Sequence, residues 1–368
     1  MESLSRDEVA DVLETIAPDL ERVEAILLEA STAGTPFLTE SASYLTKAGG
    51  KRLRPALVAL SSRLWSDPPD EAPIEAPDSR KAPLKASGNP SEAPLKAPGN
   101  PKAPLKERDD AVPSRADSTG AAIELTHLAT LYHDDVIDEA DTRRGVPSAN
   151  GKWGNIVAIL VGDFLFARAS SIAADVGGEV PRVLADAIAR VVQGQVRELE
   201  HLYDCRRPVE HYYATVDDKT GALLEASSRL GAVLGGCPED QAEPLRLFGA
   251  AFGMAFQIAD DLLDLSATQE DLGKPPGTDL RDGVYTLPLL YAVETEPSLA
   301  DQLGTPQPDV DLIRKTVVRT GAFQRALDVA AGHVDEALTC LDGAPEGPAR
   351  DSLERLTRLI IDRVPVLE

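Results

Sequence analysis

Apolar residues recur every three to four positions along most of the chain, a spacing typical of amphipathic α-helices. Alternating apolar and polar runs bounded by hairpin signals, which would indicate strands, are essentially missing. The pattern predicts helices over 6–30, 44–48, 56–65, 119–139, 155–174, 181–203, 209–235, 243–265, 286–294, 308–341 and 349–366. We therefore expect an all-α protein that forms a single large helical bundle around a central cavity.

One segment, 67–118, interrupts this pattern. It is rich in Pro, Ala, Ser and Lys, and it repeats Ala-Pro-Leu-Lys from Ala82, Ala93 and Ala103. Proline at this density blocks helices and central strands. We expect a disordered or polyproline-II-like surface insert; a docking motif is the alternative, although surface loops tolerate added length at small entropic cost. The N-terminal helices of 1–66 and the helical core of 119–368 would then form one domain.

Composition and charge narrow the class of protein. Apolar residues make up 43% of the chain and aromatic residues only 4%, which suits helix packing. The net charge of −24 argues against nucleic acid and against an anionic membrane surface as partners. The three cysteines, Cys205, Cys237 and Cys340, have no paired spacing that would indicate a disulfide frame or a zinc site.

Two further features bear on location. The first residues are polar and lack the apolar region of a secretory signal. No apolar stretch approaches the length of a membrane span, since the run 156–161 is too short. We expect a cytoplasmic protein without a membrane span.

Two aspartate clusters share one spacing, Asp-Asp-x-x-Asp, and each lies inside an apolar helical run, at 134–138 and 260–264. On a helix, positions i and i+4 share a face, so the first and last acids of each cluster lie side by side. Packed carboxylates repel one another and are costly to bury unpaired. A solvated acidic face would explain one such cluster, but two in apolar helices favour bound hard cations such as Mg²⁺.

Basic residues alternate with these acids along the chain. Gly49-Gly50 precedes three bases and a predicted helix start, where backbone donors and cationic side chains together bind anions. Each base alone is explained as a solvated surface residue, but the whole set favours two diphosphate pockets. The set comprises Lys51, Arg52, Arg54, Arg143, Arg144, Lys219 and Lys274.

Taken in order, these motifs resemble those of the trans-isoprenyl diphosphate synthases (polyprenyl synthetases), of the medium- to long-chain type. The motifs are 49–55, 133–138 with 143–145, 162–165, 256–264, 273–275 and 279–281. The resemblance implies the all-α isoprenoid synthase type of fold, a homodimer and a Mg²⁺-dependent prenyltransferase. Such an enzyme condenses isopentenyl diphosphate head-to-tail with an allylic diphosphate to give an all-trans polyprenyl diphosphate.

The resemblance also assigns roles to residues. About three Mg²⁺ ions would be held on the allylic diphosphate by the six aspartates, which are Asp134, Asp135, Asp138, Asp260, Asp261 and Asp264. The same diphosphate would be contacted by Arg143, Lys219 and Lys274, with Thr220 and Gln257 close by. Isopentenyl diphosphate would be bound by Gly50, Lys51, Arg54, His127 and Arg144. Phe256 would pack on the growing isoprenoid, although its spacing alone indicates only a core residue.

The chain departs from the family pattern at one place. Family members often carry a lysine after an Asp-Gly pair near the substrate loop, whereas here Asp282-Gly283 is followed by Val284-Tyr285. A basic contact over the site is therefore either absent or supplied by Arg281.

Product length is predicted from side-chain volume. Ala129 and Thr130 lie one turn before Asp134, at a place that aromatic rings block in short-chain members of the family. Small side chains leave room that a ring would fill, so we predict an open tunnel and a product of about C30 or longer. A short-chain (farnesyl or geranylgeranyl) diphosphate synthase is the first alternative.

The two acid clusters also argue against two other functions. A non-catalytic partner subunit of a heteromeric synthase usually lacks one cluster, and both are complete here. A class I terpene cyclase normally mixes Asn, Ser or Thr, and Glu in its second metal motif, whereas this chain repeats Asp-Asp-x-x-Asp.

Overall fold

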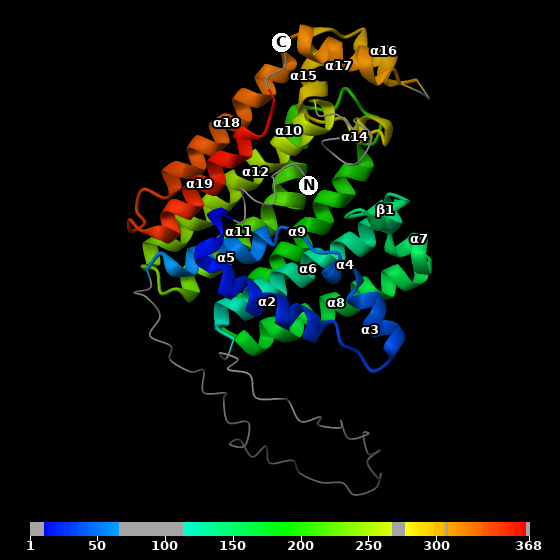
Figure 1. Ribbon diagram of the computed structural model, residues 1–368. Helices are drawn as coiled ribbons and strands as arrows, with labels where there is room; N and C mark the ends of the chain where they lie inside the picture. The colour runs from blue at the N-terminus through cyan, green and yellow to red at the C-terminus, as the bar shows by residue number, and fades with distance from the viewer. Residues whose placement is uncertain (1–10, 66–112, 267–276, 306–307, 366–368) are drawn as a thin grey trace, which may run out of the picture.

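The computed structural model describes residues 11–65, 113–266, 277–305 and 308–365 (Figure 1). Helices form almost all of this part, which confirms the all-α prediction. The first helices are η1 (Glu14–Ile16), α2 (Ala17–Ala30), α3 (Pro36–Ala42), α4 (Tyr44–Lys47), α5 (Leu53–Arg63), α6 (Arg115–Ile137), α7 (Ala149–Trp153), α8 (Asn155–Val176) and α9 (Val180–Glu200). The later ones are α10 (Val209–Val216), η2 (Asp217–Gly221), α11 (Ala222–Leu234), η3 (Glu239–Gln241), α12 (Ala242–Ser266), α14 (Thr278–Arg281), α15 (Leu287–Thr295), α16 (Leu299–Leu303), α17 (Val310–Arg319), α18 (Ala322–Cys340) and α19 (Pro348–Asp362).

Most boundaries of the predicted helices lie within two residues of the prediction, but several places differ, and the short helices α3, α7, α14 and α16 were not predicted. The run predicted over 308–341 is two helices, because Gly321 adopts φ +73° and ends α17. The run over 209–235 is interrupted by a π-helical turn, η2. The run over 6–30 is helical as α2 only from Ala17, and residues 1–10 lie outside the described part. Two two-residue strands, β1 (Thr142–Arg143) and β2 (Val146–Pro147), form an antiparallel hairpin that the pattern missed.

The insert boundary also moves. Ser114 caps α6: its hydroxyl accepts from the Asp117 amide, and the Asp117 carboxylate accepts from the Ser114 amide. The helix therefore begins four residues earlier than the predicted 119, within the segment that we predicted to be an insert. The repeats of the insert, from Ala82 to Lys106, lie outside the described residues.

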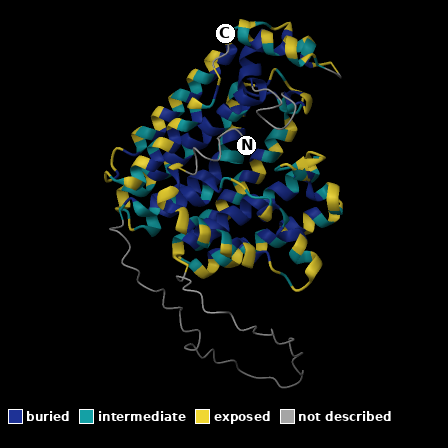
Figure 2. Ribbon diagram, in the orientation of Figure 1, coloured by how far each residue is buried: buried dark blue, intermediate teal, exposed yellow. Residues whose placement is uncertain are grey.

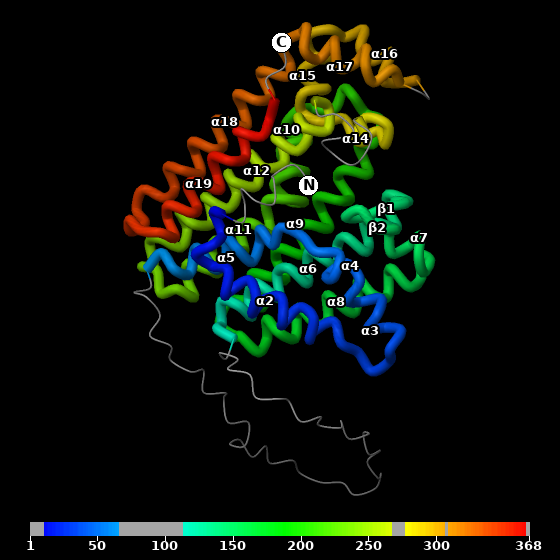
Figure 3. Tube along the Cα trace, viewed as in Figure 1, coloured from blue at the N-terminus to red at the C-terminus, as the bar shows by residue number. Residues whose placement is uncertain are grey.

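Buried residues line the inside of the described helices (Figure 2), and the apolar ones among them form two clusters. One gathers α5, α12, α15, α18 and α19, and the other gathers α2, α6, α8, α9 and α11. Side chains of α5 and α11 enter both clusters, so these two helices join the halves of the bundle. In the tube view α18 and α19 run side by side along one edge, packed on α12 (Figure 3).

Helix α8 is apolar on its outside as well as on its inside. Ile156, Ile159 and Leu160 expose 76%, 43% and 59% of their surface, although the helix packs extensively on α6. By length and composition α8 could cross a membrane, and 33% of its most apolar window is buried. The prediction that no apolar stretch approaches such a length was therefore wrong, because it considered only the unbroken run 156–161. The remaining described residues contain no other helix of this kind.

The two aspartate clusters occupy equivalent places, in the last turns of α6 and α12. The carbonyl end of a helix carries partial negative charge, which disfavours carboxylates there and favours cations. The β1–β2 hairpin follows the first cluster, α14 follows the second, and both lie on the same side of the molecule (Figure 1). The two clusters therefore lie next to elements on the same side of the molecule.

Candidate active site

In the first cluster, Asp134 and Asp138 share a face, as their spacing predicted. Burial, helped by Asp138 and opposed by Lys219, raises the pKa of Asp134 to about 6. The Asp134 carboxylate has no hydrogen bond or ion pair to any described residue. Two neighbouring acids, one of them unpaired, make a favourable place for a divalent cation.

Asp135 points elsewhere and is fully buried. One of its oxygens accepts from Arg143 Nε at 2.6 Å, and the other accepts from the Ala149 amide at 3.2 Å. Both oxygens thus serve to hold the β1–β2 hairpin and the start of α7 against α6. The structure therefore ties Asp135 to the position of Arg143.

The hairpin separates the two arginines that follow the first cluster. Arg144 and Gly145 form its turn with φ of +53° and +74°, which is typical of a two-residue hairpin loop. Arg143 faces the acids, whereas Arg144 donates to the carbonyl oxygens of Leu45, at 3.0 Å, and Gly49. A Cβ on Gly50 would lie 3.0 Å from the Arg144 guanidinium carbon, so glycine permits this approach.

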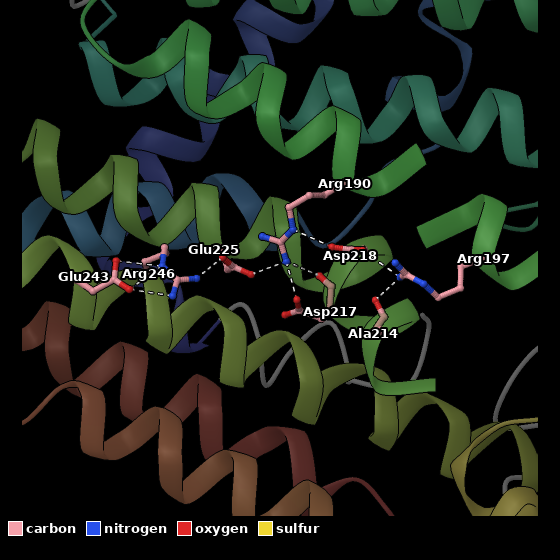
Figure 4. Close-up of polar contacts among 8 residues, drawn as sticks. All are labelled: Arg190, Arg197, Ala214, Asp217, Asp218, Glu225, Glu243 and Arg246. Carbon is pink, nitrogen blue, oxygen red and sulfur yellow. Dashed lines mark hydrogen bonds and ion pairs between the residues drawn. The ribbon is translucent and has the colours of Figure 1, made fainter. Parts of the chain in front are cut away.

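Lys219 and Thr220 lie in the π-helical turn η2, which one face of α9 holds in place (Figure 4). Arg190 of α9 pairs with Asp217 and Asp218 at 2.8 and 2.9 Å. The carboxylate of Glu225 completes this network by pairing with Arg190 at 2.9 Å and with Arg246 of α12 at 2.5 Å. These pairs connect α9, η2, α11 and α12 around a single turn.

Further along the same face of α9, three residues continue the contact with η2. Gly194 lets the Lys219 backbone approach, because a Cβ there would lie 2.6 Å from the Lys219 nitrogen. Arg197 pairs with Asp218 at 3.0 Å, and Glu198 pairs with Lys219 Nζ at 2.5 Å. Burial alone would lower the pKa of Lys219, but Glu198, Asp134 and Asp138 raise it above its ordinary value. Lys219 therefore acts electrostatically on the first acid cluster.

Thr220 connects the same turn to the second cluster. Its hydroxyl donates to Gln257 Oε1 at 2.8 Å, and Gln257 Nε2 donates to Asp261 at 2.9 Å. Tyr212 donates to the other oxygen of Asp261 at 2.5 Å. Burial, and then Asp279, raise the pKa of Asp261 well above its ordinary range. Like Asp135, this middle acid of its cluster has both oxygens engaged within the chain.

The outer acids of the second cluster also have partners. Asp260 pairs with Arg363, at the end of α19, at 2.9 Å. One Asp264 oxygen accepts from the Asp279 amide at 3.2 Å. Arg363 also lies over the Phe256 ring, 5.0 Å from its centre, and Phe256 is buried beside Phe252 in the first apolar cluster. The C-terminal helix therefore reaches the second acid cluster.

A group of cations surrounds the start of α5, as the sequence predicted. Arg52 is fully paired, with Glu24 at 2.8 Å and Glu124 at 3.0 Å. Arg54 Nε is buried without a hydrogen-bond partner, and burial, together with Arg144, lowers the Arg54 pKa to about 10. Burial, followed by Arg54 and Arg144, lowers the pKa of His127 well below its ordinary value. Half-buried Lys51 precedes the same helix start. An anion would relieve this excess of positive charge.

The structure thus brings together most of the predicted residues in two groups, the acids flanking η2 and the bases at α5. Lys274 lies outside the described residues. Arg281 is exposed at the end of α14. The backbone is held on either side of Val284, because the Tyr203 amide donates to the Gly283 carbonyl and Arg207 donates to the Tyr285 carbonyl. Sequence reasoning missed Arg190, Glu198, Arg207, Tyr212 and Arg363, whose partners lie far away along the chain. Among the described residues, no group of three or more His, Cys, Asp or Glu side chains could hold a metal ion unaided.

Comparison with known proteins gives a consistent picture. The family model described as polyprenyl synthetase matches residues 95–318. The nonaprenyl diphosphate synthase of Mycobacterium tuberculosis is 37% identical over 93% of this chain and 91% of its own length. The heptaprenyl diphosphate synthase component 2 of Geobacillus stearothermophilus is 34% identical over 94% of this chain and 96% of its own. A polyprenyl synthase from Caulobacter crescentus, crystallised with calcium and isoprenyl diphosphate, superposes with a TM-score of 0.80 at 29% identity, covering 99% and 100% of the two chains.

The close approach at Gly194 gives a stability prediction. We expect Gly194→Ala to lower the free energy of unfolding by about 1–3 kcal/mol, because the new methyl group meets Lys219 backbone that has no room to yield. The matched control is Gly332→Ala in α18, where nothing lies within 4 Å and alanine stabilises a helix by up to about 1 kcal/mol. Denaturant unfolding followed by circular dichroism measures both. Equal stability of the two variants would contradict the close packing of α9 on η2.

Proposed function

The chain belongs to the polyprenyl synthetase family, and we propose that it is a Mg²⁺-dependent prenyltransferase. In this proposal it condenses isopentenyl diphosphate with an allylic diphosphate to give an all-trans polyprenyl diphosphate. The observation that carries the proposal is the turn η2, from which Lys219 acts electrostatically on the first acid cluster and Thr220 connects through Gln257 to the second. The cluster of cations at α5 supports a second anion site, because the buried Arg54 Nε there has no hydrogen-bond partner among the described residues.

The donors of the chain fit hard cations. The first cluster offers carboxylate oxygens only, and Asp134 is unpaired beside Asp138. We propose Asp134, Asp138, Asp260 and Asp264 as the main Mg²⁺ ligands, helped by diphosphate oxygens and water. Asp135 and Asp261 would coordinate only by giving up their bonds to Arg143, Tyr212 and Gln257. Bound Mg²⁺ would neutralise the leaving diphosphate.

In this proposal the basic side chains bind the two diphosphates and the apolar side chains exclude water. Arg143 and Lys219, with Lys274, bind the allylic diphosphate and stabilise the charge it gains as its C–O bond breaks. Arg54, Arg144, Lys51 and His127 hold isopentenyl diphosphate at α5, where its terminal alkene carbon attacks the allylic cation. A new C–C bond forms, a proton leaves the isopentenyl unit, and the released diphosphate accepts that proton. Phe256 and other apolar side chains exclude water that would quench the cation.

A test of the reaction uses the purified chain alone with farnesyl diphosphate, labelled isopentenyl diphosphate and Mg²⁺. We expect polyprenyl diphosphates of defined length, and a loss of product when the metal is chelated. Asp134→Asn should lower kcat/KM roughly a hundredfold or more, because it removes a charged metal ligand. The control Asp186→Asn, on the exposed side of α9, should leave it unchanged. A cyclised hydrocarbon would favour a terpene cyclase, and no turnover without a second protein would favour a partner subunit.

Product length follows from the place of Ala129 on α6. This side chain is fully buried beneath the first acid cluster, and Thr130 folds its hydroxyl back onto the His127 carbonyl at 2.8 Å. Neither side chain could block an elongating tail as an aromatic ring would. The names of the two sequence relatives, nonaprenyl and heptaprenyl synthases, support a product of about C30 or longer.

Ala129→Phe tests this assignment. We expect the ring to fill the path of the tail and to shorten the product to about C15–C20. Ala129→Val, with less added volume, should give intermediate lengths. Thin-layer or liquid chromatography of the dephosphorylated products measures chain length, and the thermal midpoint of each variant monitors folding. An unchanged product distribution in a folded Phe variant would rule out this position as a determinant of length.

We further propose that the apolar face of α8 binds a second copy of the chain. The exposed Ile156 and Leu160 of α8, with Val192 and Val196 of α9, supply apolar surface beyond what single scattered residues expose. A homodimer is favoured by the resemblance noted in the sequence. The name of the Geobacillus relative, component 2, supports a heteromeric partner as the alternative. The cytoplasmic location expected from the sequence stays a prediction.

Sedimentation or light scattering tests the assembly. We expect twice the mass of a single 39.2 kDa chain, and Leu160→Glu should shift the protein to the monomer because it buries a charge in an apolar contact. Leu312→Glu, at a similarly exposed apolar residue of α17, is the matched control and should stay dimeric. A monomeric wild-type chain, or a Leu160→Glu variant that stays dimeric, would contradict this surface.

A further inference from the structure

Arg207 is a buried cation that no described carboxylate pairs with. It lies between α9 and α10 and exposes 6% of its surface. Its Nη2 donates to the Tyr285 carbonyl at 2.8 Å, whereas its Nε is buried without a partner. Its guanidinium forms no ion pair with a described residue. An unpaired buried charge is costly, so a fold that keeps one requires compensation from another source.

The surroundings of Arg207 place it at the candidate active site. Its guanidinium carbon lies 6.0 Å from the centre of the Tyr212 ring, and the Tyr212 hydroxyl donates to Asp261 at 2.5 Å. Burial lowers the pKa of Arg207, and the charges that oppose this are led by Glu198, the partner of Lys219, followed by Tyr212 and Asp261. Arg207 thus lies near residues that hold η2 and near the second acid cluster.

One other arginine in the described part of the chain has a buried Nε without a partner, namely Arg54. Arg54 was predicted from the sequence to bind a diphosphate, and Arg207 shows the same pattern beside the other anion site. A guanidinium offers several N–H donors in a plane that match diphosphate oxygens. We propose that Arg207 binds the allylic diphosphate together with Lys219, using the Nε side of its guanidinium while Tyr285 anchors Nη2.

This inference rests on the proposed function, and a binding measurement separates the two. The probe is inorganic diphosphate with Mg²⁺, titrated calorimetrically into the full chain. Arg207→Gln should weaken diphosphate binding roughly ten- to a hundredfold, because it removes a hydrogen bond to a charged group. The matched control is the neighbouring Arg206→Gln, whose side chain is exposed and which should bind as the wild type does. Product formation by the wild type tests the function independently.

A purely structural role for Arg207 predicts a different result. In that case Arg207→Gln loses only the bond to Tyr285, which would lower the thermal midpoint and leave the diphosphate affinity of the folded protein unchanged. An unchanged affinity would overturn the proposal. Should Arg207→Gln fail to fold, Arg207→Lys decides the matter. Lysine keeps the charge but is unable to reproduce both contacts of the planar group. The diphosphate affinity of this variant should therefore fall several-fold, and its KM for the allylic substrate should rise. Wild-type affinity in that variant would also overturn the proposal.

Discussion

The contact between one face of α9 and the turn η2 is the constraint on which the site depends. Glycines make it possible: Gly194 admits the Lys219 backbone, and a Cβ on Gly253 of α12 would lie 2.9 Å from Gly221 Cα. Helices on both sides of η2 therefore approach it more closely than any residue larger than glycine would allow at these two positions. The extra residue of a π turn changes the faces on which successive side chains lie. As a result Lys219 pairs with Glu198 of α9 and acts electrostatically on the first acid cluster, whereas Thr220 bonds to Gln257 of α12 beside the second.

Held in this frame, the site carries charge that the described residues leave uncompensated. Asp134 and Asp138 repel each other, and the carbonyl end of α6 adds to the unfavourable potential. At α5 the opposite imbalance exists, since Arg54 has no carboxylate partner in the described part of the chain and burial, followed by Arg54, lowers the pKa of His127 well below its ordinary value. Both imbalances cost folding free energy. Cations and diphosphates relieve them together, so substrate binding and site stability are linked.

Helical periodicity and the acid spacing account for what the sequence could predict. Asp134 and Asp138 share a face because residues four positions apart on an α-helix lie on the same side. The boundaries of α9 and α12 follow from their apolar stripes. The π turn was invisible, since Asp217–Gly221 continues an ordinary helical pattern and the insertion results from packing. Arg190 and Arg207 were missed because periodicity gives the face of a side chain and never its distant partner. The break at Gly321 and the Arg144-Gly145 hairpin did have local signals, a helix-ending glycine and a two-residue turn.

The apolar helix α8 connects the surface of the bundle to the first acid cluster. Gly162 of α8 lets the His133 ring approach, because a Cβ there would lie 2.3 Å from His133 Nε2. That nitrogen is 3.2 Å from the Ile159 carbonyl oxygen, and the ring packs on Phe166 at 5.6 Å. His133 directly precedes Asp134, so its ring packs α8 against the beginning of the first acid cluster. Burying the outer face of α8 would restrict the helix, because its apolar side chains would gain packing partners. A second copy bound on the proposed α8 surface would therefore lie against the helix that contacts the His133 ring.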